Sequence, residues 1–112
     1  MNTPTDIVYI KPSRKPDKII EADFGGDIMK QVIGKDGCYF KLTTKNTAVD
    51  YIWYNYDTKN IEIWGDNSSC LNSEKILTKR IFIIISKMIT NDQNLSKICL
   101  DYYNSYKSSD TN

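Results

Sequence analysis

The residues whose types and spacing could do chemistry form one tetrapeptide, Gly34-Lys35-Asp36-Gly37, which has apolar residues on both sides. Glycine has no Cβ atom, so the main chain at such a turn can approach a phosphodiester backbone closely. Lys35 adds a positive charge, and a helix beginning after Gly37 would direct its first amide groups to the same place. The same spacing also occurs at ordinary corners between two helices, and the tetrapeptide alone favours such a corner.

The rest of the composition contains few of the residues that catalysis or metal binding usually requires. The chain has 112 residues, enough for one domain, and it contains no histidine, the commonest general base and metal ligand near neutral pH. Cys38, Cys70 and Cys99 are far apart and form no CxxC pair. The acidic residues are not grouped for Mg²⁺ or Ca²⁺. We therefore expect a non-enzymatic protein without a metal or another cofactor.

The cysteine content and the net charge limit the cellular compartment and the kind of partner that we expect. Three widely spaced cysteines do not suggest a disulfide framework, so a reducing, intracellular compartment is expected, the cytoplasm first and the nucleus not excluded. The N-terminus lacks the pattern of a signal peptide, and no apolar run approaches the ~18 residues of a membrane span. The net charge of +1 favours a local nucleic-acid site over a broadly basic surface.

The first half of the chain reads as an arm, a strand and two short helices. Residues 1–17 hold all three prolines and several basic residues, and we expect a flexible basic arm there. Lys18–Phe24 is a plausible strand. Asp27 could cap a helix that ends at Gly34, and a second helix is expected over Cys38–Lys45.

The second half predicts a hairpin and two further helices. Val49–Tyr56 is β-branched and aromatic, and a polar turn joins it to a second strand, Ile61–Trp64. We expect a polar loop over Gly65–Asn72 and a long helix from about Ser73 to Thr90, apolar over much of its circumference. After a break, a last helix is expected over Leu95–Tyr106, followed by a disordered tail, residues 107–112. The order indicates an α+β domain with helices on one face of a small antiparallel sheet.

The neighbourhood of the tetrapeptide resembles a known family. Val32–Phe40 (VIGKDGCYF) is similar to the I-I-G-x-x-G-x-x-I core of the KH domain, a module that binds single-stranded RNA and DNA. Thr47–Tyr51 (TAVDY) stands where the family often has T-G-A-x-I, and Ile61–Gly65 (IEIWG) resembles its V-x-I-x-G strand. The long helix that follows suits the eukaryotic, type I order, β-α-α-β-β-α. The resemblance covers roughly residues 19–89, so residues 18–90 form the expected KH-like domain and 91–106 an additional helix.

The resemblance implies a site made of the turn and an adjacent apolar groove. Apolar side chains beside the turn can hold unstacked bases, with RNA favoured over DNA. Val32, Ile33 and Phe40 are expected mainly to seat the two helices, and Trp53 could stack on a base. The candidate nucleic-acid contacts are Gly34, Lys35, Asp36 and Gly37 in the turn, with Met29, Lys30, Ile33, Lys41, Ile52 and Trp53 around it.

One departure from the family keeps an alternative open. The family favours glycine or a basic residue inside the turn, whereas Asp36 is acidic and repels phosphate. The alternative is a degenerate KH-like module that binds a protein partner, or a second copy of itself, through the two C-terminal helices and does not bind nucleic acid. A nucleic-acid site that Asp36 has only weakened is the leading hypothesis.

Overall fold

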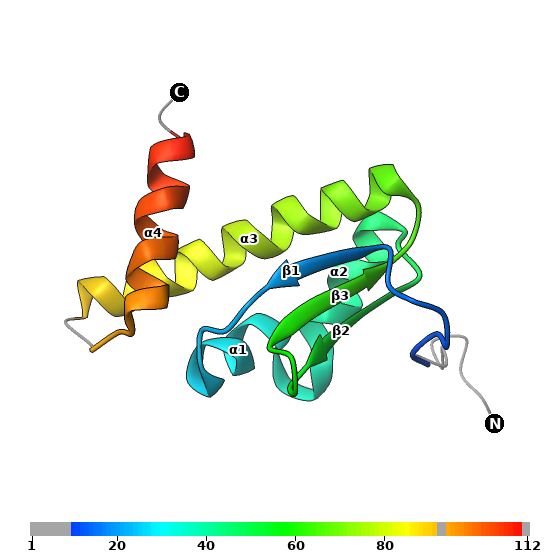
Figure 1. Ribbon diagram of the computed structural model, residues 1–112, viewed down its shortest axis with the longest axis horizontal. Coiled ribbons are helices and arrows are strands. Elements are labelled where there is room, and N and C mark those ends of the chain that lie inside the picture. The colour runs from blue at the N-terminus through cyan, green and yellow to red at the C-terminus, as the bar shows by residue number, and fades with distance from the viewer. Residues whose placement is uncertain (1–9, 92–93, 111–112) are drawn as a thin grey trace.

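The chain folds into a three-stranded antiparallel sheet with helices on one face (Figure 1). The computed structural model describes residues 10–91 and 94–110. The α+β class, the three-stranded antiparallel sheet and the additional C-terminal helix, all expected from the sequence, are confirmed. The elements in chain order are β1 (Lys18–Glu21), α1 (Gly26–Ile33), the 3₁₀ turn η1 (Lys35–Gly37), α2 (Cys38–Thr47), β2 (Tyr51–Asn55), β3 (Asn60–Trp64), α3 (Asn67–Thr90) and α4 (Lys97–Asp110).

The central strand of the sheet is β3, which pairs on one side with β1 and on the other with β2. Ile63 lies opposite Lys18 of β1 and opposite Ile52 of β2, so both edge strands are in antiparallel register with it. The expected hairpin between β2 and β3 is confirmed, although β2 is shorter than Val49–Tyr56. Strand β2 lies at an edge of the sheet, and α2 packs against it.

The core lies between the sheet and the helices. Side chains alternate along a strand, so Ile52 and Tyr54 point to the helices while Tyr51 and Trp53 lie on the other face. Helix α3 runs behind the sheet and contacts α1, α2 and β3. The fully or almost fully buried apolar side chains include Ile20, Ile28, Met29, Val32, Phe40, Ile52, Ile61, Ile63, Leu77, Ile81 and Ile85.

Helix α3 begins inside the segment expected to be a polar loop. Asp66 caps it, because its carboxylate accepts a hydrogen bond of 2.7 Å from the backbone amide of Ser69. Ser73 is completely buried, donates to the Ser69 carbonyl at 3.0 Å and contacts the Thr47 hydroxyl at 2.7 Å. The expected helix start near Ser73 is wrong, because these polar residues form a cap and a buried hydroxyl link between α2 and α3.

The first two helices also differ from expectation at their ends. Asp27 does not cap α1: the N-cap is Gly25, and no side-chain bond is made there. Asp27 lies in the first turn, where a negative charge still interacts favourably with the helix dipole. Helix α2 continues past Lys45 to Thr47, and its threonine hydroxyls bond back to carbonyls four residues earlier, as Thr43 does to Tyr39 at 2.8 Å.

The described part of the expected flexible arm, residues 10–17, is bound to the sheet. Trp64 Nε1 donates to the Arg14 carbonyl at 2.8 Å, and the Asp17 carboxylate accepts from the Gly65 amide at 2.8 Å. The Arg14 guanidinium donates to Asp17 at 2.7 Å and to Asp50 at 3.0 Å. The arm therefore covers one end of the helix-free face, over Trp64. Residues 1–9 lie outside the described residues.

Helix α4 crosses the C-terminal end of α3, and its far end points away from the body of the molecule (Figure 1). Phe82 of α3 stacks with the rings of Tyr103 and Tyr106, with centroids 5.1 and 4.5 Å apart. Helix α4 continues to Asp110, beyond the expected end at Tyr106. None of the helices in the described part of the chain is long and apolar enough to span a membrane.

Candidate nucleic-acid interface

The Gly34–Gly37 tetrapeptide forms a tight corner between α1 and α2. Gly34 ends α1, where its amide donates to the Lys30 carbonyl at 2.9 Å, and the Gly37 amide donates back to the Gly34 carbonyl at 3.0 Å. Three of the four residues have positive φ: 84° at Gly34, 56° at Asp36 and 75° at Gly37. Backbone of this kind suits glycine and is tolerated by aspartate better than by most residues.

The two glycines are required for different reasons. A Cβ atom on Gly34 would overlap the Tyr39 ring and lie 2.8 Å from Cys38 Sγ and 2.9 Å from the Tyr39 amide nitrogen. A Cβ atom on Gly37 would meet only Lys41 Cε, at 3.9 Å. Gly34 thus lets the first turn of α2 pack closely, as an ordinary corner would, whereas Gly37 leaves open space on the outer side of the turn.

Arg80 of α3 contacts both helices at the turn, and the sequence analysis did not identify it as a site residue. Its guanidinium lies 3.6 Å from the centroid of the Tyr39 ring and donates from Nη2 and Nε to the Gln31 carbonyl, at 2.9 and 3.3 Å. A cation near the last carbonyls of α1 also interacts favourably with the helix dipole. Only the packing of α3 against α1 and α2 brings Arg80 to the turn, so no local motif could reveal it.

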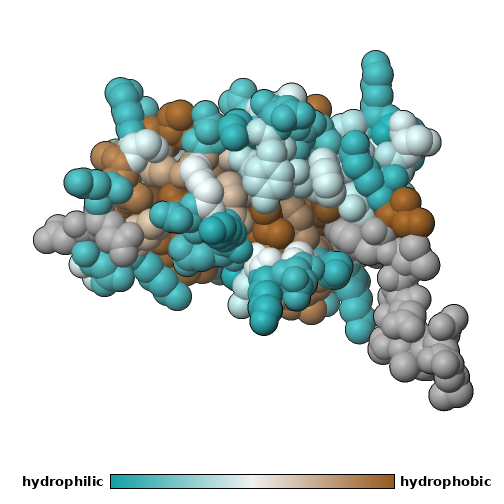
Figure 2. All heavy atoms as spheres, turned by 90° about the horizontal axis from the view of Figure 1, so that it is seen from below, coloured by the Kyte–Doolittle hydropathy of each residue, from teal (hydrophilic) through white to brown (hydrophobic). Residues whose placement is uncertain are grey.

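A groove of about 250 Å³ runs between the turn and the edge strand β2. Figure 2, seen from below, shows apolar side chains exposed between hydrophilic rims on the side where α1, α2 and β2 lie. The charged groups on its lining are one carboxylate, Asp36, and one ammonium, Lys41. The lining residues are Ile33, Asp36, Gly37, Phe40, Lys41, Tyr51, Ile52, Trp53, Tyr54 and Tyr56.

The structure brings together six of the ten candidate contacts in this groove. These are Ile33, Asp36, Gly37, Lys41, Ile52 and Trp53. Gly34 and Lys35 belong to the adjoining turn, and Lys30 is exposed on α1 away from the lining. Met29 is 1% exposed and lies in the core, where it borders a smaller hollow of about 70 Å³.

Aromatic side chains of β2 contribute more to the groove than the sequence predicted. Tyr54 is buried and donates to the Ala22 carbonyl at 2.9 Å, and its burial raises the pKa of its hydroxyl above the ordinary value. Tyr56, which is 61% exposed, packs against it edge-to-face with centroids 4.8 Å apart. The alternation that places Tyr54 on the helix side also places Tyr56 there, so period-2 counting beyond the strand end could have found it.

Trp53 lies where the groove meets the helix-free face of the sheet. Its ring stacks on Tyr51, with centroids 6.4 Å apart, and remains 38% exposed. Lys11 of the arm places its ammonium 5.7 Å from the centroid of the Trp53 ring. The arm thus adds a positive charge at this end of the groove.

No family model, curated protein or solved structure matches this chain significantly. Within residues 10–91 and 94–110, no cluster of three or more acidic or cysteine side chains could hold a metal ion. The geometry of the groove and its surroundings therefore carries the functional argument.

Proposed function

We propose that this protein binds single-stranded nucleic acid, RNA in preference to DNA, with a KH-type site formed by the turn and the groove. The observation that carries the proposal is the groove itself, which joins a glycine turn to an aromatic edge strand. The order of elements, β1-α1-α2-β2-β3-α3 in an antiparallel sheet, is the order that the KH resemblance implies and supports the proposal.

The chemistry of the groove suits unpaired bases. Ile33 is the partly exposed aliphatic side chain of the groove, and Phe40 and Ile52 are buried beneath it at 4% and 1% exposure. The rings of Trp53 and Tyr56 can stack on the faces of bases, a contact that does not depend on the sequence of the ligand. About four nucleotides would lie across the turn and groove in a site of this type. Double-stranded nucleic acid keeps its bases stacked and would not fill such a groove.

The turn supplies the contacts to phosphate. Gly37 leaves room for the backbone of the ligand and Lys35 is exposed beside it, whereas the Cys38 amide that begins α2 already donates to the Lys35 carbonyl. Asp36 offsets this attraction, so a single site is expected to bind weakly. A second site on a partner or a second copy would raise the apparent affinity through effective concentration.

A second candidate function rests on the C-terminal helices. Ile83 of α3 is 41% exposed and lines a hollow of about 400 Å³ with Phe82 and Lys87. Ile98 and Leu100 of α4 are 48% and 42% exposed. Large apolar side chains exposed on both C-terminal helices favour the alternative function, a module that binds a protein partner or a second copy and does not bind nucleic acid.

Fluorescence anisotropy with short random-sequence RNA and DNA oligonucleotides tests the leading proposal. The Lys35→Asp variant places two acids in the turn and should weaken binding at least about tenfold, with a smaller salt dependence. Lys75→Asp, the same charge change at an exposed position of α3, should leave the affinity nearly unchanged. Absence of binding by the wild type at low salt, or equal binding by Lys35→Asp, would contradict the proposal.

Light scattering tests the second candidate. A mass that doubles with concentration, and returns to that of the monomer in an Ile83→Glu variant, would support self-association through the C-terminal helices. A strict monomer across the accessible concentration range would contradict dimerisation.

A further inference from the structure

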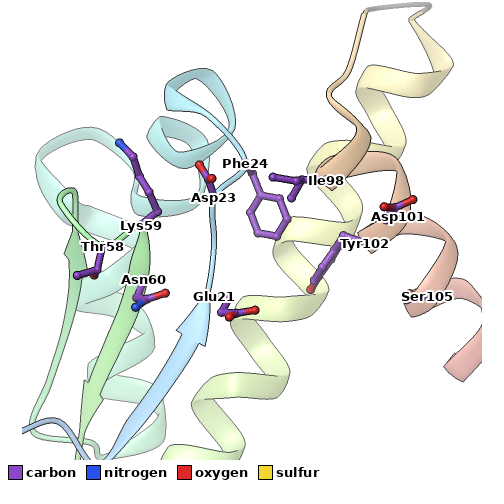
Figure 3. Close-up of a pocket in the computed structure, with 10 residues that line it drawn as sticks. All are labelled: Glu21, Asp23, Phe24, Thr58, Lys59, Asn60, Ile98, Asp101, Tyr102 and Ser105. Atoms are coloured by element: carbon purple, nitrogen blue, oxygen red, sulfur yellow. The ribbon is translucent and has the colours of Figure 1, made fainter.

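A second hollow lies on the other side of the hairpin, between the end of β1 and helix α4 (Figure 3). Its cavity volume is about 550 Å³, larger than the groove at the turn. We call it the α4 cleft. Its lining comes from the segment after β1 (Glu21, Asp23, Phe24), from the hairpin (Thr58, Lys59, Asn60) and from α4 (Ile98, Asp101, Tyr102, Ser105).

The floor of the α4 cleft is a fixed aromatic pair. The rings of Phe24 and Tyr102 meet edge-to-face with centroids 4.9 Å apart, and Figure 3 shows them facing one another in the middle of the cleft. Tyr102 donates its hydroxyl to the Thr78 carbonyl at 2.9 Å, and burial raises its pKa well above the ordinary value. Cys99 Sγ, 3.6 Å from the Phe24 carbonyl, ties α4 to the same segment.

The rim of the cleft carries three carboxylates and one ammonium. Asp101 forms an ion pair of 2.8 Å with Lys97. In the described part of the chain, Glu21 and Asp23 form no ion pair within 4.0 Å, and neither does Lys59. In Figure 3 the Lys59 ammonium points away from the two rings. Glu21 and Asp23 therefore line the cleft as carboxylates without a direct ion pair, and Lys59 is the one ammonium among the lining residues.

This combination selects a positively charged ligand. A phosphate or an acidic peptide would be repelled by Glu21 and Asp23, and a neutral ligand would cover these carboxylates without compensating their lost hydration. A guanidinium or ammonium group gains from the carboxylates and from the face of an aromatic ring. The apolar stem of a lysine or arginine side chain can lie along Ile98 and Phe24 while its charged end reaches the rim.

We propose that the α4 cleft binds a lysine or arginine side chain presented by a basic segment of a partner protein. Charge complementarity carries the choice of occupant, and the polar groups of Thr58, Asn60 and Ser105 around the opening suit the backbone of such a segment. The proposal also gives α4 a role, because one whole wall of the cleft belongs to this helix. It does not depend on nucleic-acid binding at the turn.

Titration with a short peptide of alternating glycine and arginine, followed by ¹H–¹⁵N NMR, tests the proposal on the full chain. Amide shifts are expected at Asp23, Phe24, Lys59 and Tyr102. The double variant Glu21→Gln with Asp23→Asn keeps the shape of these exposed side chains and should weaken binding roughly tenfold. The matched control is Asp27→Asn with Asp57→Asn, which removes the same charge at exposed positions outside the cleft and should change the affinity less than about twofold.

Several results would overturn the proposal. They are an absence of shifts at these amides, equal weakening by the two double variants, and equal binding of a peptide of alternating glycine and glutamate. Shifts at the cleft produced by oligonucleotides and not by the arginine peptide would assign the cleft to nucleic acid instead. None of the peptide results bears on the Lys35→Asp test with oligonucleotides, so the two proposals fail separately.

Discussion

The groove at the turn and the α4 cleft both have aromatic and apolar floors, but their rims carry different charges. The groove is bordered by Lys41 and Asp36, with Lys35 and Lys11 close by. The cleft is bordered by Glu21, Asp23 and Asp101, with Lys59 turned aside. An aromatic floor binds bases and organic cations alike, so the charges on the rim decide the class of ligand.

The same hairpin serves both hollows. Tyr54 and Tyr56 at the end of β2 line the groove, and Thr58 to Asn60 in the turn line the cleft. The hydroxyl of Tyr54 bonds to the Ala22 carbonyl, next to the cleft residues that follow β1. The two hollows are therefore neighbours on opposite sides of one hairpin.

The largest expected effect separates the two glycines of the turn, Gly34 and Gly37. Gly34→Ala should lower the free energy of unfolding by about 3 kcal/mol, because its φ and ψ of 84° and 163° suit glycine alone and the added Cβ overlaps Tyr39. Gly37→Ala should cost only about 1 kcal/mol, since positive φ is its sole strain. Urea denaturation measures both values.

The Gly34→Ala variant should also divide the two activities. Where the variant remains folded, the displaced first turn of α2 should reduce oligonucleotide binding, while the arginine peptide should still bind the α4 cleft. Equal stability losses for Gly34→Ala and Gly37→Ala would show that the close contact with Tyr39 does not matter. Loss of peptide binding in the folded variant would show that the two hollows are not independent.

A smaller effect tests the charge on the rim of the groove. Asp36→Gly removes a carboxylate that repels phosphate and relaxes a residue at φ 56°, so oligonucleotide affinity should rise about threefold to tenfold. Asp36→Asn removes the charge and tolerates the same backbone, and should give most of this gain. Anisotropy titrations measure the gain, and the arginine peptide should bind as before. No gain in either variant would mean that Asp36 does not face the ligand.

Much of the fold was predictable because its signals are local. Alternation and turn residues predict the β2–β3 hairpin, and the glycines predict the corner at Gly34. The start of α3 was missed because Asp66 and the serines after it resemble a polar loop until the burial of Ser69 and Ser73 is known. The binding of residues 10–17 depends on Trp64, 50 residues from the carbonyl of Arg14 that it contacts, and no local pattern records that contact.

The candidate site was only half predictable for the same reason. The spacing of the motif predicted the turn, and the pattern of the strand predicted Ile52 and Trp53. Arg80 reaches the turn from a distant helix, and Met29, expected in the groove, is in the core because α1 presents that side to the sheet. The α4 cleft could not be predicted at all, because it exists only where α4 packs against the segment after β1.

The smallest expected effect concerns the arm, which borders the groove and not the cleft. The Arg14 guanidinium, together with the Gly65 amide, holds the pKa of Asp17 below its ordinary value of 3.8. The ionised Asp17 carboxylate therefore stabilises the folded state fully at pH values above 3.8. This stabilisation is lost as the pH falls below 3.8 and through the lowered pKa of Asp17 in the folded protein. Asp17→Asn should be slightly less stable than wild type at neutral pH, and the difference should vanish in this acidic window.

Tryptophan fluorescence during urea denaturation at pH 7 and below pH 3.8 measures the difference. Because Trp64 donates to Arg14, its emission should also shift in Asp17→Asn before unfolding begins. Asp57→Asn, an exposed aspartate at the hairpin turn, serves as the control and should parallel wild type at every pH. A constant difference between Asp17→Asn and wild type across the acidic window would mean that Asp17 holds the arm by shape and not by charge. The arginine peptide should bind the α4 cleft equally in Asp17→Asn and wild type at pH 7, since the arm does not line that cleft.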